Sequence, residues 1–224
     1  MNCEEHVRDL YDYALQKGFR KEQFISADNA REFIDTTVDA YDGYPLFQYV
    51  FPKKYDRNLF ACMIDADFKT RFHTLAGIAS SPNFESVLVA EPPLVKKPGM
   101  LQYLKQVGIK GVGLFLHSAV FRQDNFENYA AAKRRSYMDE KTWYVYIFAT
   151  KKQCQRKGYG KKVMNLICSY ADEKKARLCL ETNLEDNVVM YEHFGFRMVD
   201  SGCYRNNVKH FVFLKEPDVS LKGE

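Results

Sequence analysis

The sequence predicts a mixed α/β (α+β) protein in which helices and strands alternate along the chain. Apolar residues recur at helical spacing in several segments, and the clearest stripe runs from Val163 to Ala171. Between these segments lie short runs rich in aromatic and β-branched residues, such as residues 143–150, which are typical of buried strands. The 224 residues, 46% of them hydrophobic, suffice for one globular domain with a sizeable core. Interleaved elements of this kind indicate packed layers of sheet and helix.

The first half of the chain is expected to be mainly helical. An amphipathic pattern predicts a helix up to Gly18, and an apolar run predicts a short strand over residues 19–25. Capping residues at 26–29 precede a second helix, and a third is predicted over residues 57–72. Between these two helices, residues 46–51 form a dense aromatic patch, which serves either as core or as the wall of a substrate pocket.

The remaining elements follow from turn residues and periodicity. Two short strands, at 73–79 and 86–90, are joined by Ser-Ser-Pro-Asn and should form a hairpin. Later helices are predicted at 100–107, 112–135, 163–171 and 187–193, and later strands at 143–150, 177–182, 196–204 and 210–214. We expect a single domain over residues 1–224 that carries a helical insertion at about 92–140.

Composition excludes several classes of function. The net charge of +4, from 33 basic and 29 acidic residues, is too small and dispersed to favour a nucleic-acid partner. No apolar run approaches the roughly 20 residues of a membrane span. Six scattered cysteines, without paired spacing, argue against a metal site or a disulfide scaffold. Because the N-terminus lacks a signal peptide, we expect a cytoplasmic protein that binds neither membrane nor metal.

The loop Gln-Arg-Lys-Gly-Tyr-Gly at residues 155–160 is the first candidate for chemistry. It lies between a predicted strand and a predicted helix, so unpaired N–H groups and the positive end of the helix dipole should face any ligand there. The glycines permit a tight turn, and neighbouring lysines add positive charge. A pyrophosphate suits this loop, although its spacing matches neither a dinucleotide fingerprint nor a P-loop.

Two blocks of sequence resemble the GNAT superfamily of acyl-coenzyme A-dependent N-acetyltransferases. Gln155, Gly158 and Gly160 match the Gln/Arg-x-x-Gly-x-Gly/Ala signature of that superfamily. Downstream, Asn187, Tyr191 and the Gly-Phe pair at 195–196 resemble its Asn-x-x-x-Tyr-x-x-x-Gly-Phe block. The Leu-Glu-Thr-Asn stretch at 180–183 and the Tyr-Pro-Leu-Phe stretch at 44–47 are similar to the puromycin-acetyltransferase-like branch. The resemblance is strong over residues 143–199.

This resemblance implies a fold and a cofactor site. The sheet should be mostly antiparallel and twisted, splayed near its centre, with helices on both faces. Acetyl-coenzyme A is the implied co-substrate, and backbone groups of the splayed strand would receive its pantetheine arm. The residues implied to bind it are Phe148, Ala149, Thr150, Gln155, Arg156, Lys157, Gly158, Tyr159, Gly160, Lys161, Asn187 and Tyr191.

The catalytic residues are two candidates of different kinds. By resemblance, Tyr191 would donate a proton to the departing thiolate. Glu181, a carboxylate within a predicted strand, is either the base that accepts the proton of the amine or a structural partner of a basic group. His73, His117 and His193 are alternative bases. Cys154 suggests a covalent acyl-enzyme, but superfamily members transfer the acyl group directly.

The expected activity is therefore transfer of an acetyl group from acetyl-coenzyme A to a primary amine, on a small molecule, by direct attack on the thioester. Two alternatives stay open: a non-catalytic acyl-coenzyme A-binding or sensing domain, and a protein or peptide N-acetyltransferase. Departures from the branch pattern, at residues 141–143 and 151–154, put the acceptor side in doubt. We expect a monomer or a homodimer.

Overall fold

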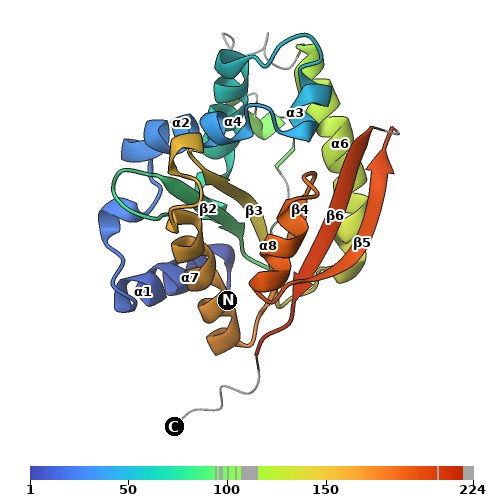
Figure 1. Ribbon diagram of the computed structural model, residues 1–224. Coiled ribbons are helices and arrows are strands. Elements are labelled where there is room, and N and C mark those ends of the chain that lie inside the picture. The colour runs from blue at the N-terminus through green and yellow to red at the C-terminus, as the bar shows by residue number, and fades with distance from the viewer. Residues whose placement is uncertain are drawn as a thin grey trace.

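Six strands form one mixed sheet in the order β1-β2-β3-β4-β6-β5 (Figure 1). The computed structural model describes residues 1–93, 95, 98–99, 101–103, 105–106, 116–205 and 207–218. The strands are Ala76–Ala79 (β1), Ser86–Glu91 (β2), Thr142–Thr150 (β3), Arg177–Thr182 (β4), Arg197–Tyr204 (β5) and Val208–Lys215 (β6). Neighbouring strands are antiparallel except β3 and β4, which are parallel. The expected mixed, mostly antiparallel sheet is thus confirmed.

Helices cover both faces of this sheet. The α-helices are Cys3–Gln16 (α1), Ala30–Tyr41 (α2), Pro45–Val50 (α3), Arg57–Arg71 (α4), Ser118–Arg134 (α6), Tyr159–Lys174 (α7) and Asn187–His193 (α8). Short 3₁₀ turns are Lys21–Gln23 (η1), Ala27–Asn29 (η2), Phe72–Thr74 (η3), Arg135–Tyr137 (η4) and Lys152–Cys154 (η5). One face packs against α1, α7 and α8, and the other against α2, α4 and α6 (Figure 1).

Local sequence explains where the first helices begin. Asn2 and Glu5 form a reciprocal capping box at the start of α1, in which each side chain accepts the backbone N–H of the other residue. The Asp56 carboxylate caps α4 by accepting the N–H of Leu59 at 2.9 Å. Both helices then bury one apolar stripe against the sheet side of the molecule, as their periodicity predicts.

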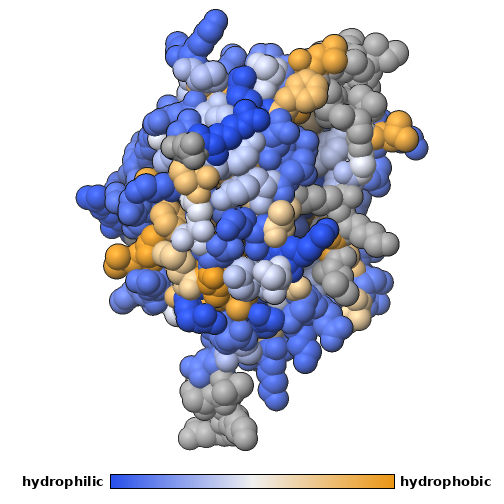
Figure 2. All heavy atoms as spheres, turned by 90° about the vertical axis from the view of Figure 1, so that its right-hand side faces the viewer, coloured by the Kyte–Doolittle hydropathy of each residue, from blue (hydrophilic) through white to orange (hydrophobic). Residues whose placement is uncertain are grey.

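The core is divided by the sheet into clusters. The largest cluster lies under α1, α7 and α8 and includes Trp143, Tyr170 and Phe213. On the other face, α2 and α4 bury a second cluster, and α3 and α6 bury a third that is rich in aromatic rings. The aromatic patch at 46–51 belongs to this third cluster. The surface over β5, β6 and α6 is mostly hydrophilic, with apolar residues in small separate groups (Figure 2).

One predicted strand is wrong. Residues 19–25 form the 3₁₀ turn η1 and a single bridge, from Phe24 to Ile78, in place of a strand. The reason is that Gln23 turns inward, where its side-chain amide donates to the carbonyl of Ala79 at 3.0 Å. The helix predicted over 112–135 begins at Ser118, and its residues 112–115 lie outside the described residues, as do residues 100, 104 and 107 of the helix predicted over 100–107. The description of the fold as one domain with an insertion stays a prediction.

Candidate active site

The parallel strands β3 and β4 diverge halfway along their length. They pair from Thr142 with Arg177 to Val145 with Leu180, and no further. Beyond this point β3 continues beside β2 as far as Thr150, and β4 continues beside β6 as far as Thr182. A register shift opposite Val89 marks a β-bulge where the strands begin to diverge. The sheet therefore opens into a wedge near its centre.

Backbone groups of β3 point into this wedge at alternate residues. The Ala149 carbonyl accepts the Ser86 hydroxyl at 3.0 Å, and the Lys151 N–H donates to the Glu85 carbonyl at 2.9 Å, so both are directed toward β2. Because hydrogen-bonding direction alternates along a strand, the backbone groups of Phe148 and Thr150 face the wedge. Of the three predicted pantetheine-binding residues, Ala149 is therefore the one whose backbone is directed away.

The loop that precedes α7 lies beside the wedge. Gly158 is the N-cap of α7 with a φ of 85°, a left-handed conformation that glycine adopts without strain. A Cβ atom on Gly160 would lie 3.0 Å from the Phe148 ring and 3.2 Å from the Thr150 hydroxyl, so glycine allows the helix to approach β3 closely. Among the described residues, no backbone carbonyl accepts the N–H groups of residues 156–161. These N–H groups are free to bind an anion.

The predicted basic residues surround this helix terminus. Arg156, Lys157 and Lys161 are exposed and form no salt bridge within the described part of the chain, while Tyr159 is half-buried. The exposed Gln155 side chain donates to the Thr150 carbonyl at 3.4 Å. The loop thus combines unpaired N–H groups, a helix dipole and mobile positive charge, the features that favour a pyrophosphate.

Helix α8 places the second predicted block at the wedge. The Asn187 amide donates to the Thr182 hydroxyl at 3.0 Å, which ties α8 to the splayed end of β4. Tyr191 is 5% exposed, and its ring centroid lies 6.4 Å from that of Phe148. Burial raises the pKa of Tyr191 well above its ordinary value, and Tyr44 and Tyr41 add to the effect. Tyr191 is accordingly a protonated phenol at neutral pH.

Two further tyrosines reach the wedge, and the sequence did not assign them a role. The Tyr44 hydroxyl lies 2.9 Å from the Thr182 hydroxyl and accepts the Asn183 N–H at 2.7 Å. Tyr41 is buried, which raises its pKa, and the backbone of Phe148 partly offsets this shift through a hydrogen bond. The Tyr-Pro-Leu-Phe stretch at 44–47 was noted as a family pattern, but the spacing gave no sign of contact with β4.

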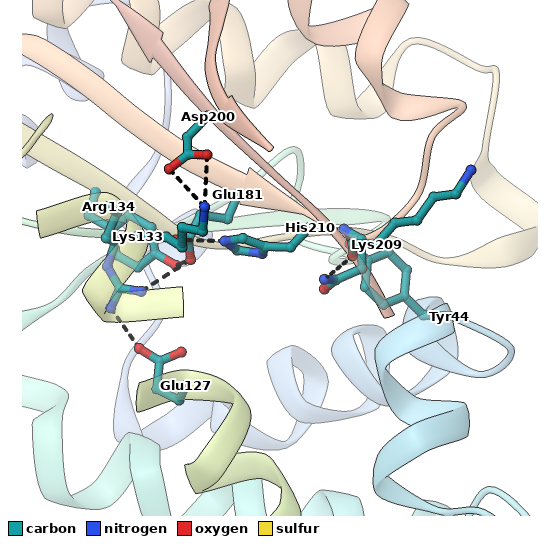
Figure 3. A network of polar contacts seen from close by, with 10 residues as sticks. Tyr44, Glu127, Lys133, Arg134, Glu181, Asp200, Lys209 and His210 are labelled. Atoms are coloured by element: carbon teal, nitrogen blue, oxygen red, sulfur yellow. Dashed lines mark hydrogen bonds and ion pairs between the residues drawn. The ribbon is translucent and has the colours of Figure 1, made fainter. Parts of the chain in front are cut away.

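Glu181 belongs to a buried ionic network on the α6 face of the sheet (Figure 3). Its Oε2 atom accepts hydrogen bonds from Arg134 at 3.1 Å and from Tyr144 at 2.8 Å. Arg134 also donates to Glu127 at 2.6 Å and stacks over the Tyr144 ring at 4.3 Å. Burial alone would lower the pKa of Arg134, but Tyr144, Glu127 and Glu181 raise it, so the guanidinium stays charged. A structural partner for Glu181 is therefore present.

The second oxygen of Glu181 faces a histidine that the sequence reasoning missed. Glu181 Oε1 lies 3.4 Å from Nε2 of His210, a residue of β6 that is 1% exposed (Figure 3). Within the described residues, neither nitrogen of His210 nor Oε1 of Glu181 has a hydrogen-bond partner. In β6, Val212 pairs with Glu181, so His210 lies diagonally across on the same face. Strand register alone could have indicated this contact.

The other candidate bases lie elsewhere. Nδ1 of His117 accepts the Ala119 N–H at 3.2 Å and so caps α6. His193 is exposed at the end of α8, and His73 lies in η3. In the described part of the chain, no cluster of three or more potential metal ligands is found, and no helix is both long and apolar enough to cross a membrane.

A pocket of about 350 Å³ lies between α4 and α6, on the same face as the ionic network. Its apolar wall includes Phe60, Ile64 and the Tyr146 ring of β3. Its polar lining includes Glu127, which connects the pocket through Arg134 to Glu181, and Asp124, which accepts a hydrogen bond from the Asn128 amide. The described residues that line the pocket include acids but neither lysine nor arginine.

Part of the chain matches a known protein family. Residues 116–216 match the family described as an acetyltransferase (GNAT) domain. An uncharacterised N-acetyltransferase of Schizosaccharomyces pombe is 33% identical over 91 residues, which cover 38% of this chain and 36% of the relative. The match thus spans little more than a third of that relative's length.

Solved structures share the fold at low sequence identity. A protein of Corynebacterium glutamicum, described as histone acetyltransferase HPA2 and related acetyltransferase, has a TM-score of 0.59 at 13% identity, with 88% of this chain and 95% of that chain covered. A mosquito arylalkylamine N-acetyltransferase, like 5b, has a TM-score of 0.54 at 13% identity, with 87% and 98% covered. Placement in the puromycin-acetyltransferase-like branch stays a prediction. The sequence motifs and the family match agree over residues 116–216, so this part of the chain is similar to the acetyltransferase (GNAT) domain, and the solved structures share its fold.

Proposed function

We propose that this protein is an N-acetyltransferase that moves an acetyl group from acetyl-coenzyme A to the primary amine of a small molecule. The observation that carries the proposal is the wedge between β3 and β4, which opens beside the unpaired N–H groups at the start of α7 and beside the buried Tyr191. An acyl-coenzyme A needs a site of this kind, because it combines a pyrophosphate, an amide-rich arm and a thioester.

Different residues would bind different parts of the donor, acetyl-coenzyme A. The loop at residues 155–161 would bind the pyrophosphate through backbone N–H groups and the side chains of Arg156, Lys157 and Lys161. Backbone groups of Phe148 and Thr150 would receive the pantetheine amides along the open edge of β3. Asn187 would hold α8 against β4, and this positions Tyr191 at the end of the wedge.

Tyr191 would act as general acid. Attack by the amine breaks the bond between the acyl carbon and sulfur, and the departing thiolate needs a proton. A phenol kept protonated by burial can supply it and then recover a proton from solvent. A backbone N–H of β3 would stabilise negative charge that develops on the thioester oxygen.

The pocket between α4 and α6 would hold the acceptor. Its aromatic wall and acidic lining suit an organic amine, which is a cation until it loses the proton that blocks attack. The structural neighbour described as arylalkylamine N-acetyltransferase like 5b is in keeping with a small amine as acceptor. Since Oε2 of Glu181 is taken by Arg134 and Tyr144, this residue can accept a proton only through Oε1.

The test is acetyl transfer by the purified protein with a panel of amines. Cys62 and Cys203 are exposed and would react with thiol reagents, so product mass is a cleaner readout than released thiol. We expect transfer to at least one small amine, and a loss of about 10²-fold or more in Tyr191→Phe. Tyr170→Phe is the matched control, because Tyr170 is equally buried but its hydroxyl bonds Asp9 on α1.

Two results would contradict the proposal. Coenzyme A binding without transfer to any amine would favour the alternative of a sensing domain that keeps the donor site. Transfer confined to peptide amines would favour a peptide N-acetyltransferase. Full turnover of Tyr191→Phe would remove the general-acid role and leave the donor site intact.

A further inference from the structure

His210 and Glu181 form a buried acid–base pair with an unused hydrogen-bonding capacity. Buried polar atoms in folded proteins nearly always have partners, so three orphan atoms within one contact require an explanation. The two side chains approach to 3.4 Å, which is too long for a good hydrogen bond but short enough to share a proton after a small movement. The pair is thus arranged to gain a proton.

The pair is also connected to the proposed acceptor side. Glu181 immediately follows Leu180, the last residue of β4 that pairs with β3, so it lies where the wedge opens. Glu127 lines the pocket between α4 and α6 and shares Arg134 with Glu181. A chain of contacts therefore runs from the pocket wall to His210 (Figure 3).

Glu181 has only one oxygen left to act as a base. Arg134, 7% exposed, and the Tyr144 hydroxyl both bind Oε2, so a proton can be accepted only at Oε1, the atom that faces His210. A neutral imidazole has one ring nitrogen that can accept a proton. A glutamate that contacts the amine and a histidine that contacts the glutamate would together provide both reach and basicity.

We propose that His210 is a positioning residue that acts through Glu181 and determines the basicity of the proton acceptor. As the carbon–nitrogen bond forms and the carbon–sulfur bond breaks, the amine nitrogen gives its proton to Oε1 of Glu181, and Nε2 of His210 takes it up. The imidazolium is stabilised by the Glu181 carboxylate, and the proton returns to solvent through the pocket once the product leaves. This inference rests on the proposed acetyltransferase function.

Several charged side chains surround His210. Helix α6 contributes the rings of Phe126 and Tyr129, each 5.6 Å from the imidazole, besides Arg134 and Glu127. It also contributes Lys133, which forms an ion pair with Asp200 of β5 at 3.0 Å (Figure 3). Strand β4 contributes Glu181, β3 contributes Tyr144, and β5 contributes Gly202, which pairs with His210. Glu181 is the carboxylate that contacts the ring among the described residues, at 3.4 Å, and it is the group that can exchange a proton with the ring.

The experiment is the pH dependence of kcat/KM for wild type and His210→Gln with one amine acceptor. Titration of the amine itself is common to both proteins, so it cancels in the ratio of their rates. We expect wild type to be about 10-fold or more faster than His210→Gln at neutral pH and above, and the ratio to fall toward one as the pH is lowered, because a protonated imidazole cannot take up the proton of the amine. His193→Gln, at an exposed position of α8, is the matched control and should leave the ratio flat.

A double variant shows whether His210 and Glu181 act together or independently. If His210 acts through Glu181, then Glu181→Gln combined with His210→Gln should be no slower than Glu181→Gln alone. A ratio that is constant with pH, or additive losses in the double variant, would overturn the inference while acetyl transfer by wild type upholds the proposed function. If wild type binds coenzyme A but transfers to no amine, both the function and the inference fail.

Discussion

Replacing Arg134 by methionine tests the ionic network most directly. The change removes a guanidinium that contacts Glu127 at 2.6 Å and Glu181 at 3.1 Å and leaves two carboxylates facing each other in a buried region. Breaking a buried pair by deleting one partner costs about 3–5 kcal/mol, because the remaining charge is uncompensated. For a chain of this size, such a loss lowers Tm by roughly 6–20 °C. Arg31→Met is the control, since Arg31 is 91% exposed and its contact with Asp35 contributes little.

Urea denaturation at two pH values gives the assay. At pH 7 the Arg134→Met variant should show the full loss in free energy of unfolding. At about pH 5 it should recover part of that loss, because the buried carboxylate left without a partner becomes protonated, so that the variant takes up a proton on folding. Adding Glu181→Gln should restore part of the stability at pH 7 as well. A loss under 1 kcal/mol, or an equal loss at both pH values, would refute the view that Arg134 holds buried charges together.

Three further outcomes follow from the structure. Gly158→Ala and Gly18→Ala both place a side chain at a positive φ, so each should lower the free energy of unfolding, measured in urea, by about 1–2 kcal/mol. Only Gly158→Ala should also weaken coenzyme A binding, measured by calorimetry. Equal effects of the two variants on binding would contradict the role of the loop. Burial raises the pKa of the Cys168 and Cys179 thiols to about 12, so mass spectrometry after brief alkylation should find both unmodified in the native protein and labelled only after unfolding. Because burial also raises the pKa of Tyr191, kcat should show no fall up to about pH 10, and an earlier fall would argue against a protonated Tyr191.

The proposed donor half of the site could be located from the sequence because its residues lie close together in the chain. The loop at 155–160 carries its own backbone geometry, and Asn187 and Tyr191 share one helix face at a spacing of four residues. Strands and helices in this region were found within a few residues of their predicted ends, because their apolar periodicity is strong. Local chemistry of this kind needs no knowledge of the fold.

The other half depends on contacts between distant segments. Tyr44 meets Thr182 across 138 residues, and Arg134 meets Glu181 across 47. No local pattern distinguishes these residues from ordinary core or surface residues, because they meet their partners only when the sheet assembles. The strand predicted over 19–25 failed for the same reason: Gln23 found a partner in Ala79, and this contact overrode the β-propensity of its neighbours.

In the proposed mechanism, the splayed end of β4 would allow one strand to serve two proton transfers of opposite direction. Leu180 and Thr182 face the side of α8, where Thr182 holds Asn187 and where Tyr191 lies against Phe148. Glu181, between them, faces α6, Arg134 and His210. Because successive side chains of a strand point to opposite faces, a proton donor for the thiolate and a proton acceptor for the amine can approach the same wedge from opposite sides without neutralising each other. This separation requires only that β3 and β4 diverge at Val145 and Leu180, as they do.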